Sequence, residues 1–319
     1  MNRPRRRDFR RLGHGLGLIT ALSLAGAFGA TRRASADPGT DAVVAFNERC
    51  ANRLSIAFVG KTASNDSMTS PDPKLSLDGF LATDDFRERF ARFINTEFNN
   101  APGMSSLEDA PYHIAKRVLA DGSAWSQMFL GQFRLAPIAS NVAVFDDPSG
   151  LGYFRSIDWY QRYEGNEEHG IKLATAYRIM NNVIGLRLTA STASPNADQS
   201  ATGRQAAPCN SCHFNGWFAL DQVASILPLK GQAYDAYQGG PKTILGGKQI
   251  ANDKELVTAL VESENFSVNA CRLAFKFLYA REDNRCDGPV LDRCVDAFKA
   301  KKTMQSALSS IAREPGFCE

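Results

Sequence analysis

The chain has 319 residues, of which 44% are hydrophobic and 22% are charged, a composition typical of a globular protein and not of a disordered one. The formal net charge of +3 arises from residues 1–36, which hold eight arginines and one aspartate. Residues 37–319 hold 29 basic and 33 acidic residues, a net charge of −4. This balance excludes a broad basic footprint, so we expect no nucleic-acid partner.

Residues 1–36 have the pattern of an export signal peptide. Six arginines lie within residues 3–11, and an apolar stretch follows over residues 12–30. Ala34-Ser35-Ala36 then supplies the small residues that favour cleavage after Ala36. We therefore expect the mature chain to be periplasmic or secreted.

An uncleaved membrane anchor is the alternative for the same stretch. His14 and five glycines lie within it, which disfavours a span, so we expect no membrane span after cleavage. Arg6-Arg7 also resembles a twin-arginine signal. The sequence therefore leaves the export route open between the general and the twin-arginine pathways.

The mature chain reads as mainly α, with long irregular loops. Residues 60–75, 137–170 and 189–208 are loop-like, and no stretch shows a convincing strand alternation. Asp253 is placed to cap one helix, and Pro289 suits the first turn of another. Helical periodicity predicts helices over residues 43–59, 77–98, 108–119, 124–133, 171–186, 254–262, 267–281, 289–300 and 303–313.

The segment Cys209-Asn210-Ser211-Cys212-His213 is typical of a c-type haem attachment site. Each thiol can form a thioether with a haem vinyl group, and the next residue, His213, can bind the iron from one face. A zinc site would need further close ligands, and a redox disulfide would need a βαβ context. Export supports haem, because this haem is attached outside the cytoplasm. We therefore expect one covalent haem c held by Cys209, Cys212 and His213.

This motif divides the mature chain. We expect an N-terminal helical region over residues 37–188, and a cytochrome c-like haem-binding region with C-terminal helices over residues 189–319. A glycine-rich loop at residues 239–247 leads into Lys248, which suggests a phosphate-binding loop. That interpretation fails, because Gln249 follows the lysine and no glycine stands at position 242.

The second iron ligand is less well defined. Met180 ranks first, because it lies on a helix-like run shortly before the motif, and Met304 and His113 are the alternates. A methionine would raise the reduction potential, a second histidine would leave it lower, and an open position would allow ligand or peroxide chemistry. The remaining candidates in the mature chain are His169, Met68, Met104 and Met128.

Five cysteines lie outside the motif. An exported chain with four of them in its last 49 residues suggests two disulfides. Cys286 and Cys294 flank a short turn, and Cys271 can meet Cys318 if the last helix folds back, although connectivity is not fixed by sequence. Cys50 is then left over as a buried thiol.

Three groups of residues carry a resemblance to a known family. The first joins residues 53–57 and 85–90, and the second joins Gly203-Arg204, the haem motif and Leu220-Asp221. The third runs from Glu255-Leu256 through Phe266, Cys271 and Arg281 to Gly316-Phe317. In these residues the chain resembles the secreted c-type cytochrome modules of uncharacterised function found in planctomycete and myxobacterial proteins. The resemblance implies a haem module between helical modules and no settled activity.

These observations favour an exported monohaem cytochrome that transfers electrons to or from a redox partner protein. A haem-dependent, peroxidase-like oxidoreductase is the alternative, as is an electron-accepting subunit with a substrate-binding N-terminal region. About 170 mature residues precede the motif, more than a small electron carrier needs. A third hypothesis is an interaction module with a structural haem. The sequence leaves open whether the protein is an enzyme.

Overall fold

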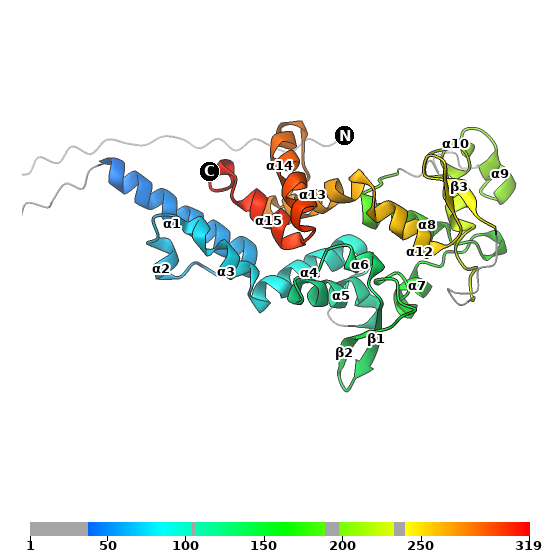
Figure 1. The fold of residues 1–319 in the computed structure, drawn as a ribbon, viewed down its shortest axis with the longest axis horizontal. Coiled ribbons are helices and arrows are strands. Elements are labelled where there is room, and N and C mark those ends of the chain that lie inside the picture. The colour runs from blue at the N-terminus through cyan, green and yellow to red at the C-terminus, as the bar shows by residue number, and fades with distance from the viewer. Residues whose placement is uncertain (1–37, 104–105, 189–197, 233–239) are drawn as a thin grey trace, which may run out of the picture. The chain divides into compact units, whose positions relative to one another are not determined.

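The computed structural model describes residues 38–103, 106–188, 198–232 and 240–319 (Figure 1). The chain divides into residues 1–41 and residues 42–319, and the architecture below is that of the second unit. The predicted export signal at residues 1–36 lies outside the described residues. No helix in the described ranges combines the length and apolar character that crossing a bilayer requires.

The second unit is mainly helical, as the sequence predicts. Each predicted helix except those over residues 77–98 and 124–133 corresponds to a single α-helix. The α-helices are α1 Pro38–Val59, α2 Asn65–Met68, α3 Leu77–Leu81, α4 Asp84–Phe98, α5 Ala110–Ala120, α6 Gln127–Leu130, α7 Ile157–Arg162, α8 Leu173–Ile184, α9 Ala201–Gln205, α10 Asn210–His213, α11 Leu220–Ala224, α12 Asp253–Val261, α13 Glu264–Tyr279, α14 Gly288–Lys301 and α15 Met304–Ala312. Short 3₁₀ helices are η1 Pro73–Ser76, η2 Leu107–Asp109, η3 Glu168–Gly170, η4 Arg285–Asp287 and η5 Pro315–Phe317.

Helix capping explains why the observed starts of α4 and α12 differ from the predicted ones. The Thr83 hydroxyl accepts a hydrogen bond from the Phe86 amide at 3.2 Å, which begins α4 and separates it from α3 within residues 77–98. The Asn252 side chain accepts from the Glu255 amide at 2.9 Å. Asn252, and not Asp253 as predicted, therefore caps α12.

Aromatic side chains join the helices that lie far apart in sequence. Phe90 on α4 is fully buried, and its ring centroid lies 5.0 Å from that of Phe277 on α13. Trp125, before α6, lies 6.0 Å from Phe90 in an edge-on geometry. We call this group the aromatic core; it comprises Phe58, Phe86, Phe90, Phe93, Phe98, Trp125, Phe129, Tyr153, Phe154, Trp159, Phe266 and Phe277.

Two disulfides cross-link this helical unit, and their pairing corrects the prediction. Cys271 on α13 bonds to Cys294 on α14, with Cα atoms 5.9 Å apart. Cys50 on α1 bonds to Cys318 near the C-terminus, with Cα atoms 4.8 Å apart. The predicted Cys286–Cys294 and Cys271–Cys318 bonds are wrong because Cys294 faces the core between α13 and α14, whereas Cys286 lies exposed on η4. Cys50 is therefore bonded, and Cys286 is the cysteine left over.

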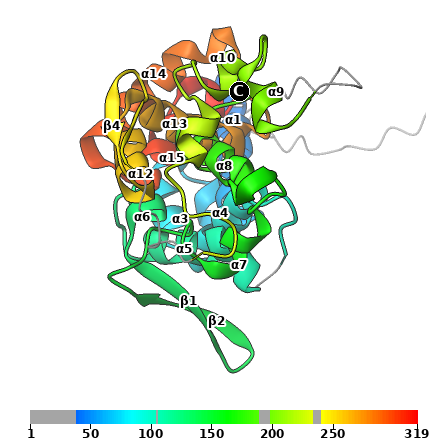
Figure 2. The ribbon, with the colours of Figure 1, turned by 90° about the vertical axis from the view of Figure 1, so that its right-hand side faces the viewer.

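Two short antiparallel hairpins occur where no strand was predicted. Strand β1 Phe133–Ile138 pairs with β2 Asn141–Asp146, and this hairpin projects from the helices in both views (Figures 1 and 2). The predicted helix over residues 124–133 is therefore wrong beyond α6. No residue of either strand is fully buried, and half-buried positions follow one another in both strands, so the strict alternation that marks a strand with one buried face is absent.

The glycine-rich segment forms the turn of the second hairpin. Strand β3 Lys242–Ile244 pairs with β4 Lys248–Ile250. Gly246 and Gly247 in the connecting turn have φ values of 76° and 105°, a region that glycine adopts without steric cost. The glycines therefore serve the turn. Gly239, the first residue of the predicted loop, lies outside the described ranges.

Candidate functional site

The haem motif occupies one turn of helix. Helix α10 follows Cys209 directly, and the amides of Cys212 and His213 both donate to the Cys209 carbonyl at 3.1 Å. The Ser211 hydroxyl donates to the carbonyl of Pro208 at 2.8 Å. α10 lies beside α9 in both views and packs against α9 and α11 (Figures 1 and 2). We call residues 198–224, which contain these three helices, the attachment segment.

Both motif thiols are free and reach the surface. Cys209 is half-buried and Cys212 is exposed, and neither forms a disulfide. The local turn therefore presents two reduced sulfur atoms, which is the state that thioether formation requires. Cys209 and Cys212 are three residues apart, so the single helical turn places both side chains on the same side of that turn.

His213 is anchored through one ring nitrogen. Its Nδ1 lies 2.6 Å from Oδ2 of Asp221, and its side chain is 24% exposed. Because a carboxylate only accepts hydrogen bonds, Nδ1 carries a proton and donates it to Asp221. Within the described part of the chain Nε2 has no hydrogen-bond partner. The imidazole is thus arranged as metal-binding histidines are, with one nitrogen held and the other open.

Asp221 is itself fixed by a buried arginine. Arg204 Nη2 lies 2.9 Å from Asp221 Oδ1, and Nε lies 3.1 Å and 3.2 Å from the two carboxylate oxygens. The two side chains are 8% and 6% exposed. Arg204 Nη1 also donates to the carbonyl of Gln199 at 2.5 Å. This chain of contacts joins α9, α10 and α11 through charged hydrogen bonds.

A tight turn follows the motif. The Gly216 backbone approaches the Ser211 carbonyl so closely that a side-chain carbon at position 216 would collide with that oxygen. The Trp217 carbonyl then accepts a hydrogen bond from the Leu245 amide at 3.1 Å, which ties the turn to the β3–β4 hairpin. The Trp217 side chain is 42% exposed, and it gives the surface beside the motif an apolar part.

The three favoured candidates for the second iron ligand lie in different places. Met180 is fully buried on α8, which packs against α11 next to the motif. Met304 is buried at the start of α15, which packs against α13 and α14. His113 on α5 has Nε2 3.2 Å from the Ser106 carbonyl. Figure 1 shows α5 and α15 well apart from α10, so only Met180 among these three lies on a helix near the attachment segment.

The remaining candidates have other surroundings. Met68 Sδ is 3.5 Å from the side-chain nitrogen Nδ2 of Asn52, and Met128 is buried in the core. His169 is exposed on η3 with a φ of 59°. Met104 lies outside the described residues.

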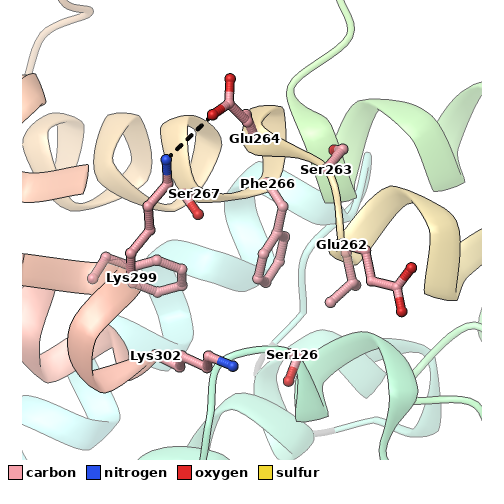
Figure 3. A pocket seen from close by; sticks show the side chains of 10 residues that line it. Ser126, Glu262, Ser263, Glu264, Phe266, Ser267, Lys299 and Lys302 are labelled. Carbon is pink, nitrogen blue, oxygen red and sulfur yellow. Dashed lines mark hydrogen bonds and ion pairs between the residues drawn. The ribbon is translucent and has the colours of Figure 1, made fainter. Parts of the chain in front are cut away.

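A separate pocket of about 400 Å³ lies where α6, α12, α13 and α14 meet (Figure 3). Phe266 and Phe298 are buried and form its apolar wall. Lys302 stands at its opening, and Lys299 Nζ lies 3.5 Å from the Glu264 carboxylate across part of the rim. Its volume is in the range of small-molecule sites, and its rim offers charges of both signs.

Asp221 and Arg204 are the functional candidates that residue-by-residue reading missed. In the sequence, both residues are marked only by the family resemblance. What distinguishes them is that both charged side chains are buried as an ion pair, which requires α9 and α11 to be folded and cannot be inferred from the sequence. Over the ranges described above, no three His, Cys, Asp or Glu side chains gather closely enough to hold a bare metal ion.

Comparison with known proteins does not assign this chain to a family. No family model matches the chain, and neither a curated protein nor a solved structure matches it significantly. The class of this protein must therefore be argued from the attachment segment itself.

Proposed function

We propose that this protein is an exported monohaem c-type cytochrome that transfers electrons to a redox partner protein. The observation that carries the proposal is the motif's geometry. Two free thiols and an imidazole follow one another on α10, and the imidazole is held by Asp221 so that Nε2 faces outward from its anchor. The donor set fits haem c, because two thiols accept the vinyl groups and one imidazole accepts the iron.

Each residue has a defined part in this proposal. Cys209 and Cys212 would hold the haem covalently, and His213 would be the proximal iron ligand. Bound haem would supply the one-electron couple. Met180 is the proposed distal ligand, because α8 packs against α11. The signal-like residues 1–36 and the resemblance to secreted cytochrome modules support export to the periplasm or beyond.

Optical and magnetic spectra of the matured protein, recorded in both redox states, test the electron-transfer proposal. A carrier with two protein ligands gives low-spin, six-coordinate iron, reacts slowly with peroxide and exchanges electrons with a soluble donor. Met180→Leu should then convert the spectrum to that of an open position, while Met128→Leu, another buried methionine, should leave it unchanged. High-spin, five-coordinate iron in the unmodified protein would contradict the carrier proposal.

The pocket at α12–α14 favours a second function, an electron-accepting subunit that binds a small molecule. Its aromatic wall and charged rim suit a ligand with an apolar body and one ionised group. The pocket lies mainly on the C-terminal helices, not on the N-terminal region to which the sequence assigns substrate binding. Thermal shifts with small aliphatic and aromatic carboxylates and amines test it, using Lys302→Ala as the variant expected to lose the shift.

A further inference from the structure

We propose that Asp221 and Arg204 are positioning residues for the iron ligand. Asp221 fixes the orientation and tautomer of His213 and lowers the reduction potential of the haem, and Arg204 holds Asp221 in place. This inference rests on the proposed function, because it concerns the imidazole that would bind the iron. It assigns a purpose to two buried charges that attachment alone does not need.

The first step of the argument is the hydrogen bond. The Nδ1–Oδ2 separation of 2.6 Å is short for a nitrogen donor and an ionised oxygen, as in a strong charge-assisted bond. Such a bond fixes which nitrogen carries the proton and restricts rotation of the ring. His213 is therefore presented in one orientation before any ligand arrives.

The second step is burial. Both Asp221 and Arg204 are almost fully removed from solvent, so their charges are weakly screened. A carboxylate that accepts from a ligand imidazole makes the other nitrogen a stronger donor to the metal. A stronger donor stabilises ferric over ferrous iron, and the reduction potential falls. Arg204 contacts both carboxylate oxygens of Asp221, including Oδ2, which also accepts from His213, so it fixes the carboxylate against the imidazole.

A purely structural ion pair is the competing explanation, and the chain contains one for comparison. Arg155 Nε and Nη2 lie 2.9 Å and 2.7 Å from the two oxygens of Asp253, which is equally buried. Asp253, like Asp221, is paired with an arginine through Nε and Nη2, but His213 contacts only Asp221. The two aspartates are therefore matched in burial and in ion pairing, and they differ in contact with the proposed iron ligand.

Potentiometric titration of the matured protein tests the inference. Asp221→Asn should shift the reduction equilibrium at least tenfold toward ferrous iron, about 59 mV for one electron. Asp221→Glu should restore part of the low reduction potential. Asp253→Asn should leave the reduction equilibrium constant within twofold of that of the unmodified protein. An unchanged potential in Asp221→Asn, or an equal shift in Asp253→Asn, overturns the positioning role.

The outcomes separate the two proposals. If the unmodified protein carries covalent haem but Asp221→Asn leaves its potential unchanged, only the positioning role fails. If the unmodified protein carries no haem under conditions that mature other exported cytochromes, the proposed function fails and the inference fails with it.

A measurement on the unmodified protein guards against an Asp221→Asn variant that does not fold. In the ferrous, histidine-labelled protein, nitrogen-15 NMR should show a proton on His213 Nδ1 that exchanges at least tenfold more slowly than that of free imidazole under the same conditions. Exchange at the rate of free imidazole would overturn the inference. Arg204→Gln should shift the equilibrium in the same direction as Asp221→Asn, toward ferrous iron, because the carboxylate that contacts His213 is no longer held in place.

Discussion

Different interactions stabilise two regions of residues 42–319: the attachment segment, residues 198–224, and the rest, which we call the helical body. In the body, α4 and α13 have 15 and 16 residues and bury phenylalanine side chains against each other. In the attachment segment, α9, α10 and α11 have five, four and five residues, and α10 buries none of its own. Helices this short are not stable alone, so charged hydrogen bonds and neighbouring helices must hold them. The proposed haem would therefore attach to a segment of short helices that charged hydrogen bonds join together.

The largest expected effect is a loss of stability when a side chain of the aromatic core is removed. Phe90→Ala should lower the free energy of unfolding of the whole unit by about 3–5 kcal/mol, because it leaves a cavity among four aromatic rings. Urea unfolding followed by circular dichroism measures it. The reduction potential of matured protein should not change. A loss below about 1 kcal/mol would show that the body does not depend on this core.

The next expected effect is a loss of stability of similar size that is confined to the attachment segment. Arg204→Met leaves the Asp221 carboxylate buried without its cation, which costs about 3–5 kcal/mol. Hydrogen exchange should show lost protection over residues 198–224, with protection in α4 and α13 retained. Loss of protection in all helices together would mean that the two regions are not energetically separate.

The disulfide between α13 and α14 supplies the third test. Replacing both Cys271 and Cys294 by Ala should lower stability by about 3 kcal/mol, since the closed loop spans 23 residues. Peptide mapping of the unreduced protein should also find Cys50 joined to Cys318 and Cys286 free to react with iodoacetamide. Recovery of a Cys286–Cys294 peptide would contradict the fold of the C-terminal helices.

The smallest effect concerns a buried lysine of the body. Burial lowers the pKa of Lys172 to about 8, although the Glu164 carboxylate 3.6 Å away raises it. Between pH 8 and 10.5 the unfolded chain holds the proton that the folded chain has released, so stability should rise with pH in this window. Lys172→Met should remove this rise, about 1–3 kcal/mol in total, in urea titrations across the window. Lys301→Met, at an exposed position, is the control, and an equal effect there would contradict the assignment.

The sequence predicted the helices well where periodicity was long. Residues 267–281 and 303–313 carry buried faces of several turns, and they became α13 and α15. The break between α3 and α4 was missed because one threonine cap interrupts an otherwise continuous apolar pattern. The hairpins were missed because β1 and β2 lack a strict alternation of buried and exposed residues, and because β3 and β4 have only three residues each, too few to show a period.

The site was predictable only as far as its local spacing. Cys209, Cys212 and His213 are adjacent in sequence, and they share one turn of α10. Asp221 and Arg204 act through contacts between separate short helices, which no periodicity encodes. The disulfide pairing failed for the same reason, because Cys50 and Cys318 are 268 residues apart and meet only in the folded unit.

The most direct test of the account is the number of haem groups bound covalently per chain. The exported protein, produced with a haem-attachment system, should retain one haem after acid–acetone extraction and in denaturing electrophoresis. Joint replacement of Cys209 and Cys212 by Ala should abolish the retained haem, whereas Cys286→Ala, a change at the exposed free cysteine outside the motif, should retain it. Haem that remains bound in the double variant, or an exported wild-type protein whose motif thiols stay unmodified, would contradict the account.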